Sequence, residues 1–567
     1  MSIAKECTKT LSIRMLKEGV SPDQVFYDKY SARGSDSLIR FNSSLFDIHN
    51  IIGYVGKIYE SQPDWELFVR NLLGAAQLKN SNLRSCGAGA ILFFSIKGRI
   101  VALCMGFIHM ALNDDMFEKQ FGLKVVLNSV SKDSLRTLDT ATPDAVTFQR
   151  RVQASKESNF QSFGVDVFRD LARVAGGKPT NAAFAKSLAG KDSLSITVKM
   201  KEEDLYKKLE EIVDVYDSQI YKNDFGWIDN MQLIEDHNTN SVLNNFLIEN
   251  IRTLIKGGAS CLHLSLPEIA TAEEFLSIQA LHYNGINKVE KREKFCEISI
   301  CDYIKKLTEC CDITLDIDAI KKHYISIKFA GGDHFSKQYR IYDCMNLEVE
   351  INDEEIASGS YVLFSGHWYH IDDSYKKHVE SIYNSVDKVN IIGRTHSLNE
   401  QALIDELERE RHADLVKLDQ TKINPNGVVY ANLEPCDFFS MNKEFIHLKD
   451  GHSSAPISHL WMQGVVSAEA FVSDKSFRSK LKNCVKIKSN GRGFEHLLPS
   501  GREKVNRDEF KVVYGIMRDA YTNGTIDIPF FSKVSFQSAI DKLNKLNISV
   551  AIELIEKTNT AQRCDND

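Results

Sequence analysis

Apolar and polar positions along the chain predict strands in its first part. Two apolar runs between Ala90 and Phe107 are separated by Lys97-Gly98. A short turn with glycine between two such runs is typical of a β-hairpin. The segment Phe121–Asn128 is rich in valine and leucine, so we expect another strand there. An amphipathic helix is expected over Glu202–Tyr216, where apolar residues recur on one face.

Other helices are predicted from start and stop signals. One begins at Val165 and is expected to stop at Gly176-Gly177, since glycine ends helices. A second covers Tyr375–Val386, and a charged third covers Asn399–Asp414. Between residues 231 and 390, segments such as HYISIKFA and SYVLFSGHWYHI alternate apolar and polar residues, which favours a largely antiparallel sheet.

These patterns predict a multidomain protein of the α+β (mixed α/β) class. We place an N-terminal α+β domain at residues 1–230 and a middle domain with an antiparallel sheet at 231–395. A C-terminal α/β domain follows at 396–567. The length of 567 residues fits several domains of ordinary size.

Composition limits the class of protein. With 43% apolar and 26% charged residues, the chain is globular and not disordered. Seventy basic and 77 acidic residues leave a net charge of −7, so a nucleic-acid or membrane site must be local. No secretory signal or apolar run of membrane length is recognised. The 12 cysteines have irregular spacing and no CxxC pair, so we expect a cytoplasmic protein with free thiols.

Several chemical signals coincide between residues 430 and 472. We expect a strand over Val428–Leu433 that ends near Asp437, and a second strand over Lys443–Lys449. A helix then starts at Ser454, with Pro456 in its first turn. On a strand, residues 447 and 449 point to the same face.

The pattern of Asp437 followed by His447 and Lys449 resembles the restriction-endonuclease-like core. In that core an acid ends one strand, and an acid and a lysine alternate on the next. Oxygen ligands hold Mg²⁺, and the lysine supports the nucleophile or the phosphate charge. Gln463, on the following helix, is typical of some nuclease branches, and His459 shares its helix face.

This chain departs from the pattern at position 447, which holds histidine where an acid is usual. Imidazole suits Mn²⁺ or Zn²⁺ better than Mg²⁺. Glu434 is the alternative carboxylate, although a regular strand places it on the face opposite Asp437. The competing interpretation is a structural ion pair between Asp437 and Lys449, with His447 an ordinary strand residue.

A basic segment follows the candidate site. Seven basic residues and no acidic residue occur between positions 475 and 494, and these are Lys475, Arg478, Lys480, Lys482, Lys486, Lys488 and Arg492. Such a local positive patch is suited to a phosphate backbone. The alternative is a solvated helix face.

Sequence motifs spread over residues 120–540 resemble a sporadically distributed bacterial family of uncharacterised proteins. The motifs are FGLKVVLN, FGVDVFRDLARVAGGKP, YKNDFGWID, YDCMNLEVEI, EPCDFF, IHLKDGHSSAPISHLWMQGVVSAE and IPFFSKVSF. The resemblance implies a link to mobile elements or antiviral defence, and it supplies no catalytic residue.

Three hypotheses follow. The first is a metal-dependent nuclease in antiviral or mobile-element defence, with Mg²⁺ or Mn²⁺ as cofactor and DNA or RNA as partner. The second is a non-catalytic nucleic-acid-binding sensor or scaffold with a degenerate nuclease-like core. The third is a transferase or a protein–protein scaffold that uses the N-terminal domain, where Arg136, Arg150 and Arg151 cluster, and nucleotide binding by residues 1–230 would favour it. A homo-oligomer is left open, and no membrane partner is expected.

Overall fold

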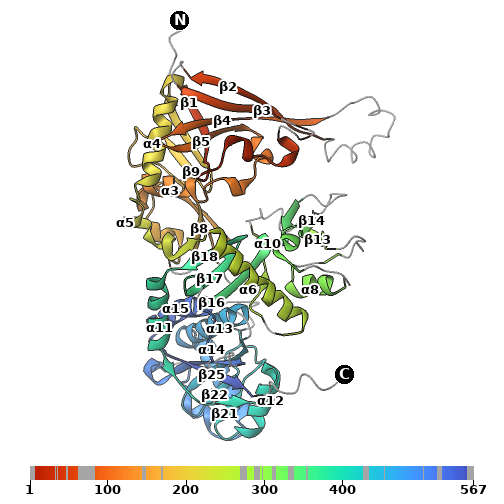
Figure 1. Cartoon of the computed structure of the whole chain (residues 1–567). Coiled ribbons are helices and arrows are strands. Elements are labelled where there is room, and N and C mark those ends of the chain that lie inside the picture. Colours follow the sequence, from red (N-terminus) through yellow and green to blue (C-terminus); the bar gives the residue numbers. More distant parts are fainter. Residues whose placement is uncertain are drawn as a thin grey trace, which may run out of the picture. The chain divides into compact units, whose positions relative to one another are not determined.

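The computed structural model divides the chain into two compact units (Figure 1). The first comprises residues 7–142 and 149–229, and the second residues 230–558. Within 7–558 the structure describes all residues except 32–33, 35, 37, 46–48, 62–83, 143–148, 168–169, 259, 268–277, 287–293, 296–297, 310–314, 330–336, 353–354, 425–432, 452–453, 502 and 520–525. The predicted three-domain division stays a prediction.

The described part of the first unit forms an antiparallel sheet of ten strands in the order β2-β3-β4-β5-β1-β10-β9-β8-β6-β7. The bounds are β1 Cys7–Met15, β2 Ile39–Leu45, β3 His49–Ser61, β4 Ser85–Ile96, β5 Arg99–Gly106, β6 Leu135–Ala141, β7 Gln149–Gln153, β8 Leu171–Gly177, β9 Ser187–Gly190 and β10 Leu194–Met200. The predicted hairpin is confirmed as β4 and β5, which Lys97 and Gly98 join with positive φ angles.

Helices α3 (Phe121–Ser129) and α4 (Leu205–Asp217) share an apolar core with this sheet, and α5 (Lys222–Phe225) follows α4. The predicted helix over Glu202–Tyr216 is confirmed as α4. The predicted strand over Phe121–Asn128 is wrong, because this segment is α3. Nearly every residue of α3 is buried, so its sequence lacks the polar face that marks a surface helix.

The predicted helix from Val165 to Gly176 is also wrong, since residues 171–177 form strand β8. A Cβ on Gly176 would lie only 2.7 Å from Cγ2 of Thr137 on β6, so glycine here permits close strand packing. The glycines therefore occur here because of strand packing in the sheet, and they do not mark the end of a helix.

The second unit begins with antiparallel sheets, in agreement with the predicted pattern. Among the described residues the strand orders are β11-β18-β17-β16-β12 and β13-β14-β15. The strands are β11 Met231–Leu233, β12 His263–Leu264, β13 Ile278–Asn284, β14 Tyr324–Phe329, β15 Lys337–Arg340, β16 Met345–Ile351, β17 Gly359–Phe364 and β18 His367–Ile371. The helices are α6 His237–Ile255, α8 Ile300–Thr308, α9 Ile317–Ile320, α10 Ile341–Cys344 and α11 Asp373–Ser385, the last confirming the predicted helix over Tyr375–Val386.

The rest of this unit is built on a mixed sheet. Its described strands run in the order β19-β25-β24-β23-β22-β21, and β20 also pairs with β25. Strands β23, β24 and β25 are mutually parallel, whereas β21 and β22 run antiparallel to their neighbours. The bounds are β19 Asp387–Lys388, β20 Arg394–Thr395, β21 Leu415–Lys417, β22 Phe438–Ser440, β23 Glu444–Asp450, β24 Lys511–Arg518 and β25 Ser549–Lys557.

Two apolar cores sandwich this mixed sheet. Helix α12 (Glu400–Glu410) packs on one face with residues such as Leu448 and Val513. The other core contains Phe445 and Tyr514 with helices α13 (Ser454–Ser473), α14 (Lys475–Ser489) and α15 (Phe530–Lys545). The alternation of residues 445 and 448 between cores follows from the two-residue period of a strand. The predicted helix over Asn399–Asp414 is confirmed as α12, with Asn399 as its N-cap.

The described residues also bear on two expectations from composition. None of the described helices has the length and apolar character needed to cross a membrane. The cysteines within the described residues are free thiols.

A candidate metal centre of three carboxylates

The candidate site lies near the edge of the mixed sheet that β21 and β22 form. Strand β22 runs antiparallel to β23, and its first residue, Phe438, pairs with Ile446 in the middle of β23. Asp437 immediately precedes β22, and its N–H donates to the carbonyl of Ile446 at 3.0 Å. The predicted strand over Val428–Leu433 lies largely outside the described residues. Strand β22 was not predicted, and it places Asp437 at a strand start.

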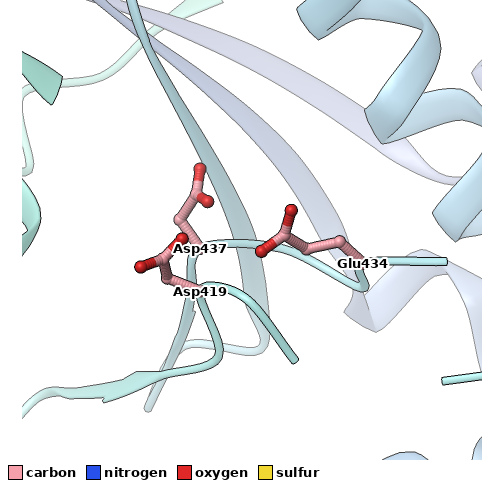
Figure 2. Close-up of side chains that lie close together, drawn as sticks. All are labelled: Asp419, Glu434 and Asp437. Carbon is pink, nitrogen blue, oxygen red and sulfur yellow. The ribbon is translucent and has the colours of Figure 1, made fainter. Parts of the chain in front are cut away.

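Three carboxylates converge at this edge. One oxygen from each of Asp419, Glu434 and Asp437 lies within 4.8 Å of the others. Figure 2 shows that these side chains come from neighbouring segments and that the Glu434 carboxylate points toward the other two. The carbonyl of Asp437 accepts hydrogen bonds from the N–H groups of Leu418 (2.7 Å) and Asp419 (3.0 Å). These bonds attach the segment after β21 to the start of β22.

Gln420 fixes the third carboxylate. Its backbone N–H donates to Oε1 of Glu434. Gln420 has a φ of 58°, in the left-handed region that non-glycine residues seldom adopt. This conformation turns the chain just after Asp419, so that the Gln420 N–H faces the Glu434 side chain.

Asp437 is the most buried of the three acids, with 9% of its surface exposed. Its Oδ2 accepts a 2.6 Å hydrogen bond from the N–H of Leu448, which favours the charged form. Burial opposes ionisation more strongly, and the nearby carboxylates of Glu434, Glu400 and Asp419 add to it. Together these effects raise the pKa of Asp437 to about 8. Without a cation, Asp437 is therefore mainly protonated at neutral pH.

Opposing effects also act on the pKa of Glu434. Burial raises the pKa of Glu434, and the charges of Asp419 and Glu400 raise it further. The hydrogen bond from Gln420 and the positive charge of Lys449 lower it. The Lys449 ammonium itself pairs with Glu400, at the start of α12, at 2.8 Å. Lys449 therefore compensates the acidic group only in part.

His447 is not part of this group. It is 3% exposed, and its Nε2 lies 3.4 Å from the Ser467 hydroxyl on α13. Burial lowers the pKa of His447 to about 3, so the imidazole is neutral. Residues 447 and 449 start on the same face of β23, but His447 packs against α13 while the Lys449 side chain reaches Glu400 of α12.

The remaining predicted residues of the site lie on α13. Gln463 is half-buried and His459 is exposed, and neither belongs to the carboxylate group. The structure thus brings Asp437 and Glu434 together near Lys449, and it adds Asp419 and Glu400. Asp419 follows the short apolar segment of β21, and an acid at a strand end was the available signal. Nothing in the sequence marks Glu400 as a site residue, because an acid is common in the first turn of a helix.

The predicted basic segment forms α14 and the turn after it. Arg478 is buried and donates to the carbonyls of Phe471, Val472 and Gly501. Lys482 donates to the carbonyl of Leu498, and Arg492 to the carbonyls of Ser489 and Leu415. These three side chains hold the local fold together.

Two other lysines of the segment lie close to the candidate site. Lys488 donates to the Thr421 hydroxyl at 2.6 Å, and Lys480 donates to the carbonyl of Asn424 at 2.9 Å. Both acceptors lie in the segment that follows Asp419, and both are neutral. Lys475 and Lys486 are exposed on the same helix.

Comparison with known proteins identifies the family. A model of DUF6119, described as a family of unknown function, matches residues 11–556, so the chain belongs to this family. Neither the curated proteins nor the solved structures contain a match to the chain.

Proposed function

We propose that this member of a family of unknown function is a metal-dependent phosphodiesterase that acts on nucleic acid. The observation that carries the proposal is the convergence of Asp419, Glu434 and Asp437 within 4.8 Å, with Lys449 beside them. Three acids this close repel one another when they are ionised, and a divalent cation removes that repulsion. The raised pKa of Asp437 is the expected sign of such a site without its cation.

The ligand set favours Mg²⁺ or Mn²⁺. All three residues offer carboxylate oxygens, the hard ligands that these ions prefer. Asp419 supplies a third carboxylate in place of the acid that the sequence pattern lacks at position 447. Lys449 on β23, the strand paired with β22, also supports the proposed restriction-endonuclease-like core, whereas Asp437 departs from that core because it precedes β22 and does not end a strand.

The residues of the site have separate tasks in hydrolysis of a phosphodiester. A bound cation would activate water and neutralise phosphate charge. Asp437 must first release its proton, and Gln420 and Leu448 keep the Glu434 and Asp437 oxygens in place through backbone N–H groups. Lys449 would leave Glu400 to stabilise the negative charge that builds up on the phosphate.

Nucleic acid as the substrate is supported by the lysines of α14. Lys480 and Lys488 lie next to the segment that carries Asp419, and their partners are neutral, so both positive charges remain available to phosphates. Lys475 and Lys486 extend this charge along the helix. DNA and RNA are equally compatible with it. A role in antiviral or mobile-element defence stays a prediction.

The second candidate function is a non-catalytic nucleic-acid-binding sensor or scaffold. The burial of His447 against Ser467 favours it, because the position that holds an acid in the nuclease pattern takes no part in the carboxylate group. Only the phosphodiesterase would cleave nucleic acid, whereas both proteins would bind it in a salt-sensitive manner.

The test is cleavage of supercoiled plasmid, linear DNA and RNA by the full chain with Mg²⁺ or Mn²⁺. We expect cleavage that Asp437→Asn, Asp419→Asn and Glu434→Gln each abolish, because these variants keep the side-chain shape and remove a ligand charge. Lys449→Met is expected to lower the rate and leave cation binding intact.

Asp405→Asn is the matched control. Asp405 lies on α12 but is exposed and bonded to Lys417, outside the carboxylate group. Its variant should cleave like the unaltered protein. Equal cleavage by all variants would assign the activity to another site or a contaminant. No cleavage with either ion, but binding that weakens with salt and with Lys488→Met, would favour the sensor.

A further inference from the structure

The sheet of the first unit contains a pocket of about 360 Å³ between β6, β8, β9 and β10. Ser187, Ala189, Ser195 and Thr197 line it, whereas the alternate residues of β9 and β10 are buried in the core shared with α3 and α4. The pocket thus lies on the sheet face opposite that core, as the period of a strand requires. Its volume falls in the range of small-molecule sites.

The hollow comes from the small size of its lining. Apart from Leu188, whose side chain is buried in the core, the residues of β9 and β10 that line the pocket are alanine, serine and threonine. The pairing of β6 with β8 is irregular near Leu135 and Thr137, so the sheet bends locally at this place. Small side chains on a bent sheet leave room that larger residues would fill.

The polar groups around this space are cationic or hydroxylic. Arg136 and Lys178 contribute two positive charges, and the residues that line the pocket include no acid and no aromatic ring. Five of them carry hydroxyl groups: Thr137, Ser155, Ser187, Ser195 and Thr197. Hydroxyl and guanidinium groups suit an anion that also carries hydroxyls. The missing ring leaves no platform on which a nucleobase would stack.

Arg136 is only partly satisfied within the described residues. Its Nη2 donates to Glu157 at 3.3 Å, and Glu157 is 71% exposed, so this ion pair is weak. Its Nη1 is buried and has no hydrogen-bond partner. A buried donor without an acceptor is unfavourable, and a small turn of the guanidinium toward an anion in the pocket would relieve it.

We propose that this pocket binds a small phosphorylated, hydroxyl-bearing ligand of the sugar-phosphate class. Arg136 offers the fork of N–H groups that matches phosphate oxygens, and Lys178 adds a second charge. Ser187 of β9 and Ser195 of β10 bind the ligand's hydroxyl groups, whereas the Thr197 hydroxyl already pairs with that of Thr10 at 3.1 Å. This site lies in the first unit and is independent of the proposed phosphodiesterase.

The experiment is calorimetric titration of the full chain with ribose 5-phosphate, ribose and inorganic phosphate in a buffer without phosphate. We expect ribose 5-phosphate to bind most tightly, phosphate more weakly and ribose not at all. Arg136→Met and Lys178→Met should each weaken binding about tenfold or more. Arg136→Lys should fall between, because it keeps the charge and loses the fork.

Two further variants keep the test decisive. Ser195→Leu fills the pocket without changing a charge, and it should abolish binding even if the Arg136 variants fold poorly. Lys186→Met is the matched control, since Lys186 bonds to the Thr8 hydroxyl and does not line the pocket. The proposal is overturned if the unaltered chain binds no ribose 5-phosphate at millimolar concentration, or if Ser195→Leu and Arg136→Met bind it normally.

Discussion

Divalent-cation binding at the carboxylate centre should depend steeply on pH, because Asp437 must lose a proton before it can act as a ligand. With a pKa of about 8, about 1 in 100 of the Asp437 side chains is ionised at pH 6 and about half at pH 8. Affinity for Mn²⁺ should therefore rise about 50-fold between these values, or about 2.3 kcal/mol in binding free energy.

The sign of this effect follows from the direction of the pKa shift. Burial and neighbouring acids raise the pKa of Asp437, so the proton is held in the free protein and released on binding. At pH 7 and below each bound ion should displace close to one proton from this residue, and at pH 8 about half a proton. In an ordinary exposed carboxylate site the affinity would be flat above about pH 5, since such acids are already ionised.

The assay is calorimetric titration of the full chain with Mn²⁺ at pH 6, 7 and 8 in two buffers of different ionisation enthalpy. The difference between buffers measures the number of protons released. Asp437→Asn keeps an oxygen acceptor for the Leu448 N–H and cannot ionise, so it should bind more weakly and lose most of the slope. An affinity that stays constant from pH 6 to 8, or a slope unchanged in Asp437→Asn, would refute the reasoning.

Three further predictions concern stability, and thermal unfolding of the full chain measures each. Gly464→Ala should lower the melting temperature by the equivalent of about 1–3 kcal/mol, because the new Cβ would lie 2.3 Å from the Tyr514 hydroxyl oxygen; an increase would contradict this packing. Arg478→Met should cost about 1.5–3 kcal/mol through three carbonyls that lose their donor, whereas an exposed nucleic-acid contact would leave stability unchanged. Lys557→Met should cost about 1.5–3 kcal/mol because it removes the 2.7 Å ion pair with Asp450, and adding Asp450→Asn should restore part of the loss.

Local periodicity was sufficient to predict several elements. Helices α4, α11 and α12 each have one apolar and one polar face, so their sequences contain the helical period. The hairpin of β4 and β5 is similarly encoded by its turn. The predictions failed at α3 and β8, where nearly all side chains are buried or the residues are small. Such segments lack a polar face, so helix and strand cannot be told apart by pattern.

The candidate site shows the same division between local and tertiary information. The sequence pattern drew attention to Asp437 and Lys449 because an acid and a lysine lie only 12 positions apart, on two segments expected to be adjacent strands. The sequence by itself determined these residue types and the strand that carries Lys449. It also determined the basic character of α14, although not which of its side chains face solvent.

Only the tertiary structure decided which groups meet. Asp419 and Glu434 approach Asp437 through backbone hydrogen bonds and the left-handed Gln420, features that residue spacing does not encode. His447 lies outside the carboxylate group because its side chain packs against α13. The pocket beside Arg136 likewise arises from strands distant in sequence that become neighbours only in the folded sheet. Local preferences act over a few residues, whereas a site is made by contacts between segments whose distance the chain alone leaves open.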